Sequence, residues 1–267
     1  MRNRTLIAAG LTLAATSAFA GANIIGYSIQ SNGNQHLYEI NFSTGMATDL
    51  GLVSFADGEG VAMDGAGTIF AVGGTINELW DVTTPPGSLI GATGTMSGID
   101  AGMDSFGGTL YAASANFGST ELYSVDPVTG LATSVGVGQY FGDNIAIDNA
   151  GNAYAADWIF DDSLYSVDLS TGAGTLIGAL GVGDTSEQAG SDFGVDGNLY
   201  MFLGNGDWYT VDTATGAATL GGQIMLATGG PLTACEGLAM NPVPEPATFV
   251  AIGAGLAALA LRRRVRK

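Results

Sequence analysis

Five acidic residues each lie a short distance ahead of a stretch of small apolar residues. These acids are Glu59, Asp100, Asp143, Asp192 and Glu236. Each is followed four or five positions later by an Asp or Asn. Carboxylate oxygens are hard ligands, which favour Ca²⁺ over transition metals. If the five stretches converge on one axis, the carboxylates gather at one mouth of it, and we predict a Ca²⁺ site there. The alternative is that each acid caps the turn into its own strand by accepting backbone N–H bonds.

The acids that follow the same stretches have a different expected role. These later acids are Asp64, Asp104, Asp148 and Asp196. A Gly or Asn follows each of them closely, as is typical of turns. Short polar side chains of this kind bond to their own backbone in turns. We therefore expect these four residues to be structural.

Few side chains in the chain could perform catalysis. His36 is the single histidine and Cys235 the single cysteine. A catalytic relay through His or Cys is therefore disfavoured, and so is a zinc site. We expect His36 to lie in a solvated turn and Cys235 to be a small packed residue. The sequence predicts no catalytic residues and no organic cofactor.

The charges are separated along the chain. All seven basic residues lie within the first four and the last six residues, and the 25 acidic residues lie between Glu39 and Glu245. A body without Lys or Arg repels phosphate groups, which excludes nucleic-acid binding and a lysine-containing phosphate loop. Cations are the natural small partners of such a body.

The segments that must position the five acids recur with a period. Segments similar to Leu-Tyr-x-Val-Asp place an aromatic residue every 42 to 44 positions, at Tyr38, Trp80, Tyr123, Tyr165 and Tyr209. Each alternates apolar and polar residues, as half-buried strands do, and leads to a glycine turn. Between these hairpins lies a second hairpin, which begins with the small apolar stretch. Each repeat therefore predicts four short antiparallel strands.

Four strands in about 43 residues are typical of one β-propeller blade. We predict an all-β propeller over residues 21–242 with five four-stranded blades. The chain offers one strand before the first hairpin, in residues 23–29, and one after the last, in residues 237–241. A C-terminal strand that joins the N-terminal blade would close the ring and remove open sheet edges. An open β-solenoid is the alternative, although it has no use for a split first repeat.

The hairpins with the pattern Leu-Tyr-x-Val-Asp-x-x-Thr-Gly, such as residues 122–130, resemble those of known propellers. They are similar to bacterial extracellular propellers of the NHL, YVTN and quinoprotein-like kinds. The resemblance covers nearly all of residues 22–242. It implies a scaffold and no particular activity, because such propellers include binding proteins, lyases, lactonases and dehydrogenases.

The first twenty residues have the pattern of a secretory signal. Arg2 and Arg4 precede the apolar run 6–15, and Ala18 and Ala20 place small residues where signal peptidase needs them. We predict a signal peptide at residues 1–20 with cleavage after Ala20. A buried helix is the alternative for this segment.

The last 25 residues consist of three consecutive parts. Pro244, Glu245 and Pro246 precede the uncharged residues 247–261, which precede the basic cluster 262–267. This order resembles the PEP-CTERM sorting signal of Gram-negative bacteria. The resemblance implies that an exosortase recognises Pro244, Glu245 and Pro246 as part of its substrate. It also implies an association with exopolysaccharide production.

The uncharged residues 247–261 predict an apolar helix of about 22 Å. This is shorter than the ~20 residues that span a bilayer comfortably, but the basic cluster behind it can hold it in a membrane. We predict that residues 243–267 are a sorting and transmembrane segment. A plain membrane anchor after a proline linker is the alternative.

One loop has the composition of a sugar-binding surface. Asp157, Asp161 and Asp162 surround Trp158 and Phe160. Exposed aromatic faces beside carboxylates can stack on sugars and bind their cations. The alternative is a loop that folds its own aromatic side chains inward.

These observations predict an exported binding or structural protein of the cell envelope or the extracellular matrix. Its expected partners are Ca²⁺, exopolysaccharide, and the signal peptidase and exosortase that process it. A Ca²⁺-dependent hydrolase or lyase that uses the acidic ring is the alternative function.

Overall fold

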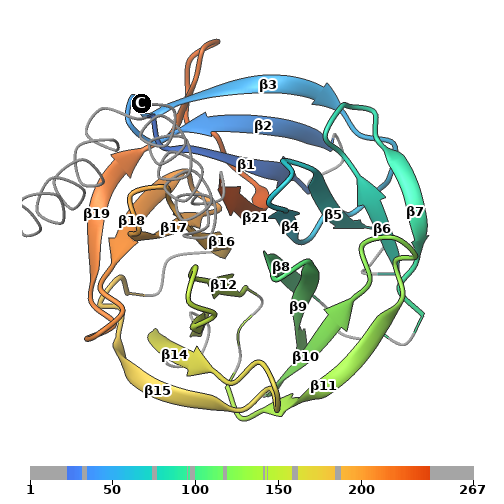
Figure 1. The fold of residues 1–267 in the computed structure, drawn as a ribbon. Helices are drawn as coiled ribbons and strands as arrows, with labels where there is room; N and C mark the ends of the chain where they lie inside the picture. Colours follow the sequence, from blue (N-terminus) through green and yellow to red (C-terminus); the bar gives the residue numbers. More distant parts are fainter. Residues whose placement is uncertain are drawn as a thin grey trace, which may run out of the picture.

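The alternating segments form strands, and the strands form five sheets arranged as blades around a central axis (Figure 1). In β10 (Ser119–Val125), Leu122, Tyr123 and Val125 are buried and Ser124 is partly exposed. A β-bulge between Leu122 and Tyr123 interrupts the pairing of β10 with β11 (Ala132–Gly138). The computed structural model describes residues 23–31, 35–73, 77–94, 96, 100–116, 119–140, 142, 144–157, 162–183 and 188–240.

The second to fifth blades each contain four antiparallel strands in chain order, with the first strand nearest the axis (Figure 1). The second blade consists of β4 (Val61–Met63), β5 (Ile69–Gly73), β6 (Glu78–Asp81) and β7 (Ser88–Ala92). The third consists of β8 (Asp100–Phe106), β9 (Thr109–Asn116), β10 and β11. The fourth consists of β12 (Ala146–Ile147), β13 (Ala153–Asp157), β14 (Ser163–Val167) and β15 (Gly174–Ala179). The fifth consists of β16 (Gln188–Phe193), β17 (Leu199–Leu203), β18 (Asp207–Val211) and β19 (Ala218–Gln223).

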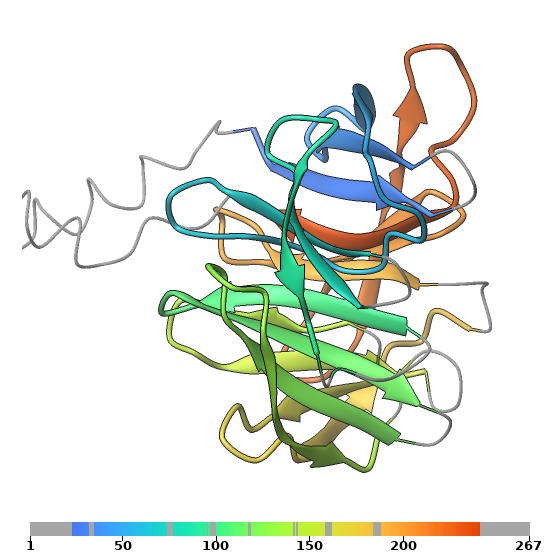
Figure 2. The same ribbon diagram turned by 90° about the vertical axis from the view of Figure 1, so that its right-hand side faces the viewer.

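The first blade is built from both ends of the propeller sequence. Its inner strand is β21 (Cys235–Met240), which pairs antiparallel with β1 (Ile25–Gln30) (Figure 2). Outside β1 lie β2 (His36–Asn41) and β3 (Met46–Leu52), and the short strand β20 (Met225–Leu226) adds to β3 in parallel. The predicted five-bladed ring and its closure by a C-terminal strand are therefore confirmed, and an open solenoid is excluded. The strand β20 was not expected.

The apolar core lies between the blades. Five clusters of buried residues each join one blade to the next. One cluster, for example, contains Phe70 and Leu79 of the second blade with Leu110 and Tyr123 of the third. Because both faces of a blade pack on neighbours, a single repeat cannot bury its own apolar surface.

The inner strand of the fifth blade differs from its prediction. The sequence places this strand after Asp192, but β16 ends at Phe193 and the chain turns at Val195 and Asp196. Asp196 bonds to the backbone N–H of Asn198, as a turn residue does. The apolar character of Phe193 and Val195 gave the wrong register, because the true strand contains Gly190, Ser191 and Asp192.

The predicted signal peptide at residues 1–20 and the predicted apolar helix in residues 243–267 lie outside the described residues. Within the described part of the chain, no helix is long and apolar enough to cross a membrane.

Candidate metal-binding site at the propeller axis

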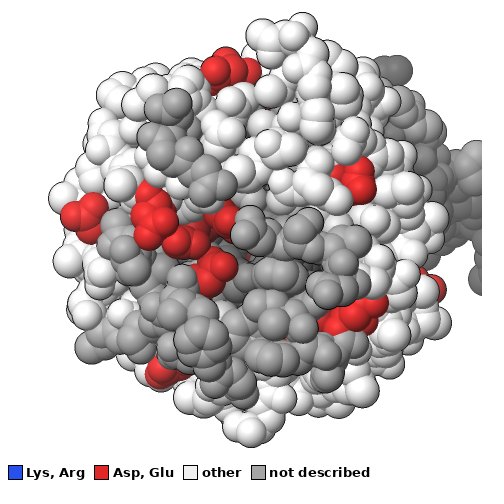
Figure 3. All heavy atoms as spheres, turned by 180° about the vertical axis from the view of Figure 1, so that it is seen from behind, with Lys and Arg blue, Asp and Glu red and all other residues white. Residues whose placement is uncertain are grey.

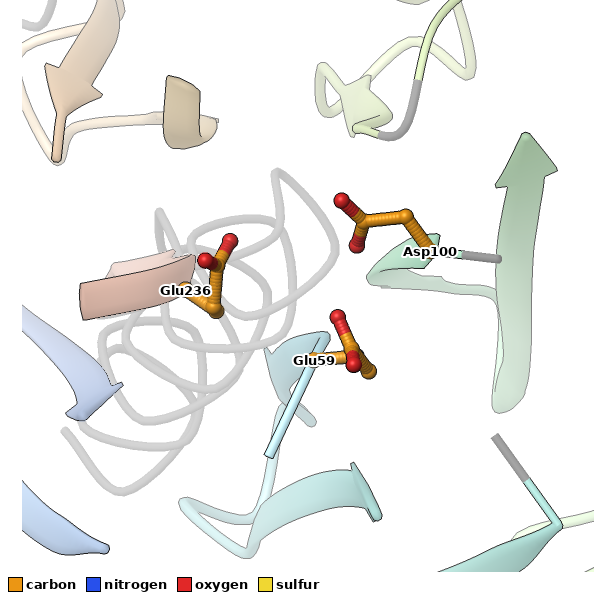
Figure 4. Close-up of side chains that lie close together, drawn as sticks. All are labelled: Glu59, Asp100 and Glu236. Atoms are coloured by element: carbon orange, nitrogen blue, oxygen red, sulfur yellow. The ribbon is translucent and has the colours of Figure 1, made fainter. Parts of the chain in front are cut away.

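Three of the five predicted acids come together at the axis. One carboxylate oxygen each from Glu59, Asp100 and Glu236 lies within 4.8 Å of the other two. Figure 4 shows the three side chains directed into a common space, Glu59 from the segment just before β4, and Asp100 and Glu236 from β8 and β21. We call these residues the carboxylate triad.

Hydrogen bonds hold each member of the triad. Glu59 lies two residues before β4, and its N–H donates to the carbonyl of Val72 at 3.0 Å. Asp100 begins β8, and its Oδ1 accepts the N–H of Ala101 at 2.8 Å. Glu236 lies in β21, and its Oε1 accepts the hydroxyl of Ser31 at 3.3 Å.

Glycines next to these acids allow the inner strands to approach one another. A Cβ on Gly237, which has φ +63°, would collide with the backbone N of Val61. A Cβ on Gly60 would lie 2.7 Å from the carbonyl oxygen of Ala101. Close backbone approach of this kind is a position where glycine is required. It brings the acids of three blades within reach of one ion.

The triad concentrates negative charge. Unit charges 4.8 Å apart repel by about 3.5 kcal/mol per pair at an effective dielectric constant of about 20. The chain has no Lys or Arg between residues 5 and 261 to offset this repulsion. The surface seen from behind carries acidic groups near the middle of the face and at the rim (Figure 3). A bound cation would relieve the repulsion.

The spacing of the triad fits a calcium ion. Oxygen ligands of Ca²⁺ lie about 2.4 Å from the ion, so two on opposite sides are about 4.8 Å apart. Three side-chain ligands are fewer than the six to eight that Ca²⁺ takes, and backbone carbonyls and water commonly supply the others. The donor set contains only oxygen, which suits Ca²⁺ better than zinc or copper.

The remaining two predicted acids are not part of the triad. Asp143 lies outside the described residues. Asp192 lies inside β16, where it is 6% exposed, and its Oδ2 accepts the N–H of Met240 at 2.6 Å. The pairing of Asp192 with Tyr200 places it one residue before the end of β16 and away from the start of the strand.

Asp104 is a site residue that sequence reasoning missed. It was expected in a turn, but it lies in β8, is 5% exposed and pairs opposite Tyr111. The strand continues to Phe106, two residues beyond the predicted turn. In the pairing register, Asp104 and Asp192 occupy the position that alanine occupies in the other three inner strands, as Ala62, Ala146 and Ala239.

A cavity of about 580 Å³ lies at the opposite end of the inner strands from the triad. Asp104 and Asp192 line it together with Ile147, Phe193 and Met240. The turns after β4 and β12 also contribute, through Asp64 and Asp148. The axis therefore carries two separate acidic groups, one at each end of the inner strands.

The single histidine and cysteine lie in other environments. His36 begins β2, and its Nδ1 lies 2.8 Å from Oδ1 of Asp49, so it is a strand residue beside a carboxylate and not the turn residue expected. Cys235 is buried, as predicted, and burial raises the pKa of its thiol. Asp157 of the predicted sugar-binding loop is 3% exposed, and Trp158, Phe160 and Asp161 lie outside the described residues.

Comparison with protein families shows one match. Residues 242–264 match the PEP-CTERM protein-sorting motif. The chain carries a PEP-CTERM sorting signal. It is therefore exported, associated with the cell envelope of a Gram-negative bacterium and subject to processing by an exosortase. Pro244, Glu245 and Pro246, which led to this prediction, lie within the match.

No curated protein matches the sequence. Among solved structures, one chain of a nidogen/laminin complex is similar with a TM-score of 0.52 and 13% identity, over 79% of this chain and 78% of that one. A protein of unknown function from Bacteroides caccae gives a TM-score of 0.47 and 13% identity, over 74% and 72%. A putative 6-phosphogluconolactonase from Bacteroides uniformis gives 0.45 and 16%, over 74% and 67%. At such identities, the similarity concerns the fold alone.

Proposed function

We propose that this chain is an exported binding scaffold that holds Ca²⁺ through Glu59, Asp100 and Glu236. The observation that carries the proposal is the convergence of these three carboxylates from three blades within 4.8 Å. The sorting signal supports an extracytoplasmic role. Signal peptidase cleavage after Ala20 is part of this proposal, because export of such a chain needs an N-terminal signal.

The bound ion would also determine which polymers the propeller can engage. A body with many acidic residues and no basic ones between residues 5 and 261 repels an anionic polysaccharide. Ca²⁺ at the axis would supply a positive centre with coordination positions free for sugar oxygens. We therefore propose exopolysaccharide as the partner and Ca²⁺ as the bridge between the two.

The proposal is for binding rather than catalysis. Among the described residues, the single histidine is paired with Asp49 and the single thiol is buried with a raised pKa. Neither provides an activated nucleophile at the triad. A Ca²⁺-dependent hydrolase or lyase, the other function considered, predicts a Ca²⁺-dependent decrease in polymer length, which size-exclusion chromatography of the polysaccharide would detect.

Calorimetric titration of the full chain with Ca²⁺ tests the proposal. We expect one site with a dissociation constant of roughly 10⁻⁴ M, as in extracellular calcium modules. The triple variant Glu59→Gln, Asp100→Asn, Glu236→Gln should lose the binding, because it removes the charges but keeps the side-chain sizes. Glu121→Gln is the matched control, since Glu121 lies in β10 and bonds to Ser134, and it should bind as the wild type does.

Sedimentation with hyaluronan then tests the bridge. The wild type should bind this anionic polymer with Ca²⁺ and lose it with EDTA. Neutral dextran serves as the comparison polymer, and its binding should not depend on Ca²⁺ in the same way. Wild-type protein that takes up no Ca²⁺, or a triple variant that binds it unchanged, would overturn the metal proposal.

A further inference from the structure

Asp104 and Asp192 form a second acidic pair that the proposed calcium site does not use. Their carboxyl groups interact with each other, and both line the cavity. Both side chains are buried, at 5% and 6% exposure. Two ionised carboxylates in such contact repel each other strongly. The pair is therefore stable when it shares one proton.

The same pair connects inner strands of four blades. Asp104 in β8 accepts the N–H of Ile147 in β12 at 2.5 Å, and Asp192 in β16 accepts the N–H of Met240 in β21 at 2.6 Å. The remaining oxygens accept the N–H groups of Ser105 and Phe193, both at 2.6 Å. The interaction between the two carboxyl groups connects the β8–β12 contact with the β16–β21 contact across the axis.

The pair is specific to two blades. The three other inner strands place Ala62, Ala146 and Ala239 in the same register, and all three are fully buried. Alanine satisfies the packing of the crowded axis, so packing alone does not require an acid there. At these two positions, apolar contacts are replaced by an interaction between the two aspartate carboxyl groups, and its strength depends on whether the pair holds a proton.

We propose that Asp104 and Asp192 form a proton-dependent latch that holds the inner strands of the third, fourth, fifth and first blades together at the floor of the cavity. With one shared proton, the latch is closed. Loss of this proton leaves two carboxylates in contact, which weakens the connection between β8 and β16.

The charged surroundings of the pair favour the protonated state. Asp64 and Asp148 line the same cavity, and Asp100 and Glu236 lie further along β8 and β21. The titratable groups opposite the pair in the adjacent strands are phenols, with Tyr111 opposite Asp104 and Tyr200 opposite Asp192. The hydroxyl of Tyr200 donates to Asp196. No Lys or Arg occurs between residues 5 and 261 to stabilise a second negative charge.

The direction of the pKa changes agrees with this arrangement. Burial, followed by the charge of Asp192, raises the pKa of Asp104 well above its usual range. Burial also raises the pKa of Asp192, to about 7. In the unfolded chain both groups titrate near pH 4. The folded state therefore holds more protons than the unfolded state above about pH 4, and its stability falls as the pH rises towards and through neutrality.

Thermal unfolding of the full chain from pH 5 to pH 8, in EDTA and at constant ionic strength, tests the latch. We expect the wild-type Tm to fall by roughly 5–10 °C over this range. The double variant Asp104→Asn, Asp192→Asn removes both titrating carboxyl groups, so its Tm should change much less with pH. Asp192→Asn alone provides a second variant. Asp148→Asn removes a negative charge from the same cavity but keeps a turn residue, and it should retain the wild-type slope.

Infrared spectroscopy adds a readout that a purely structural role would not change. The wild type at pH 6 should show the carbonyl band of a protonated carboxylic acid, and the band should disappear as the pH rises. The double variant, which has neither carboxyl group, should lack this band at pH 6. A folded wild type without the band, or a double variant that keeps both the band and the pH slope, would overturn the proposal. The spectrum of the wild type alone decides the question if both variants fail to fold.

Discussion

Tyr140 fills space between the third and fourth blades. It is 3% exposed, and its ring stacks on Tyr165 with 5.5 Å between ring centroids. Its hydroxyl finds no hydrogen-bond partner among the described residues. A buried polar group without a partner costs about 1–3 kcal/mol. The burial that creates this cost also raises the pKa of the Tyr140 phenol.

Replacing Tyr140 with Phe should therefore stabilise the protein. We expect Tyr140→Phe to raise the free energy of unfolding by about 1 kcal/mol, because the ring contacts remain and the unbonded hydroxyl is removed. Tyr200→Phe is the comparison, since its hydroxyl donates to Asp196 at 3.0 Å, and it should lower stability by about 1 kcal/mol. Urea unfolding measures both, and equal losses in the two variants would contradict the expectation.

Each of three blades contacts the next one through its outer strand. Three outer strands each carry a glycine whose backbone touches the Thr-Gly turn of the following blade. The contacts are Gly91 with Thr129, Gly136 with Thr171, and Gly178 with Thr215. The turn glycines have positive φ, as expected from the repeated Thr-Gly pairs. Two separate glycines per repeat therefore serve one interface, which accounts for part of the high glycine content.

A side chain at such a contact should separate the blades. Gly136→Ala would place Cβ against the carbonyl oxygen of Thr171, which is backbone and cannot rotate away. We expect a loss of about 2–3 kcal/mol in the free energy of unfolding. Gly65→Ala is the control, because a Cβ there meets nothing within 4 Å. If the two variants unfold at the same urea concentration, the blade contact does not have this role.

The closure of the ring by β21 should contribute strongly to the stability of the propeller. Strand β21 covers the inner edge of β1, and Leu238 and Met240 belong to the apolar cluster between the fifth and first blades. Without β21, β1 would present an unpaired edge, which promotes association with other chains. The ring should therefore depend on its last six strand residues more than on any other segment of similar length.

Truncation provides the test. A chain that ends at Ala234 lacks β21, whereas a chain that ends at Asn241 keeps it. We expect the shorter chain to self-associate or to unfold at a much lower urea concentration, and the longer one to remain monomeric. Light scattering and circular dichroism distinguish these states. A monomeric Ala234-terminated chain with an unchanged midpoint would show that closure contributes little.

The ring could be predicted from the sequence because the repeat period and the split first repeat are marked by residues that strongly favour strands. Tyr38, Trp80 and their equivalents alternate with polar residues, and residues 237–241 resemble the inner strands. The triad followed from the same alignment. Glu59-Gly60 and Glu236-Gly237 precede Val-Ala-Met and Leu-Ala-Met, so their register was unambiguous.

The register failed where an inner strand contains polar residues. In β16 the strand runs through Gly190, Ser191 and Asp192, which have weak strand preference. In β8 the acid Asp104 lies in mid-strand, where a turn was expected. Only the contact between two distant strands makes a buried acid stable at these positions. Pairing across the axis is not visible in a single segment, so the latch could not be predicted.

The position of β21 in the sequence determines the order of two steps, completion of the first blade and processing at the sorting motif. Its last residue, Met240, lies two positions before the sorting motif begins at residue 242. A chain that crosses the membrane from its N-terminus can complete four blades while the first still lacks a strand. The missing strand arrives only when the sorting motif is about to emerge. Processing by an exosortase at that motif thus follows the delivery of the strand that completes the first blade.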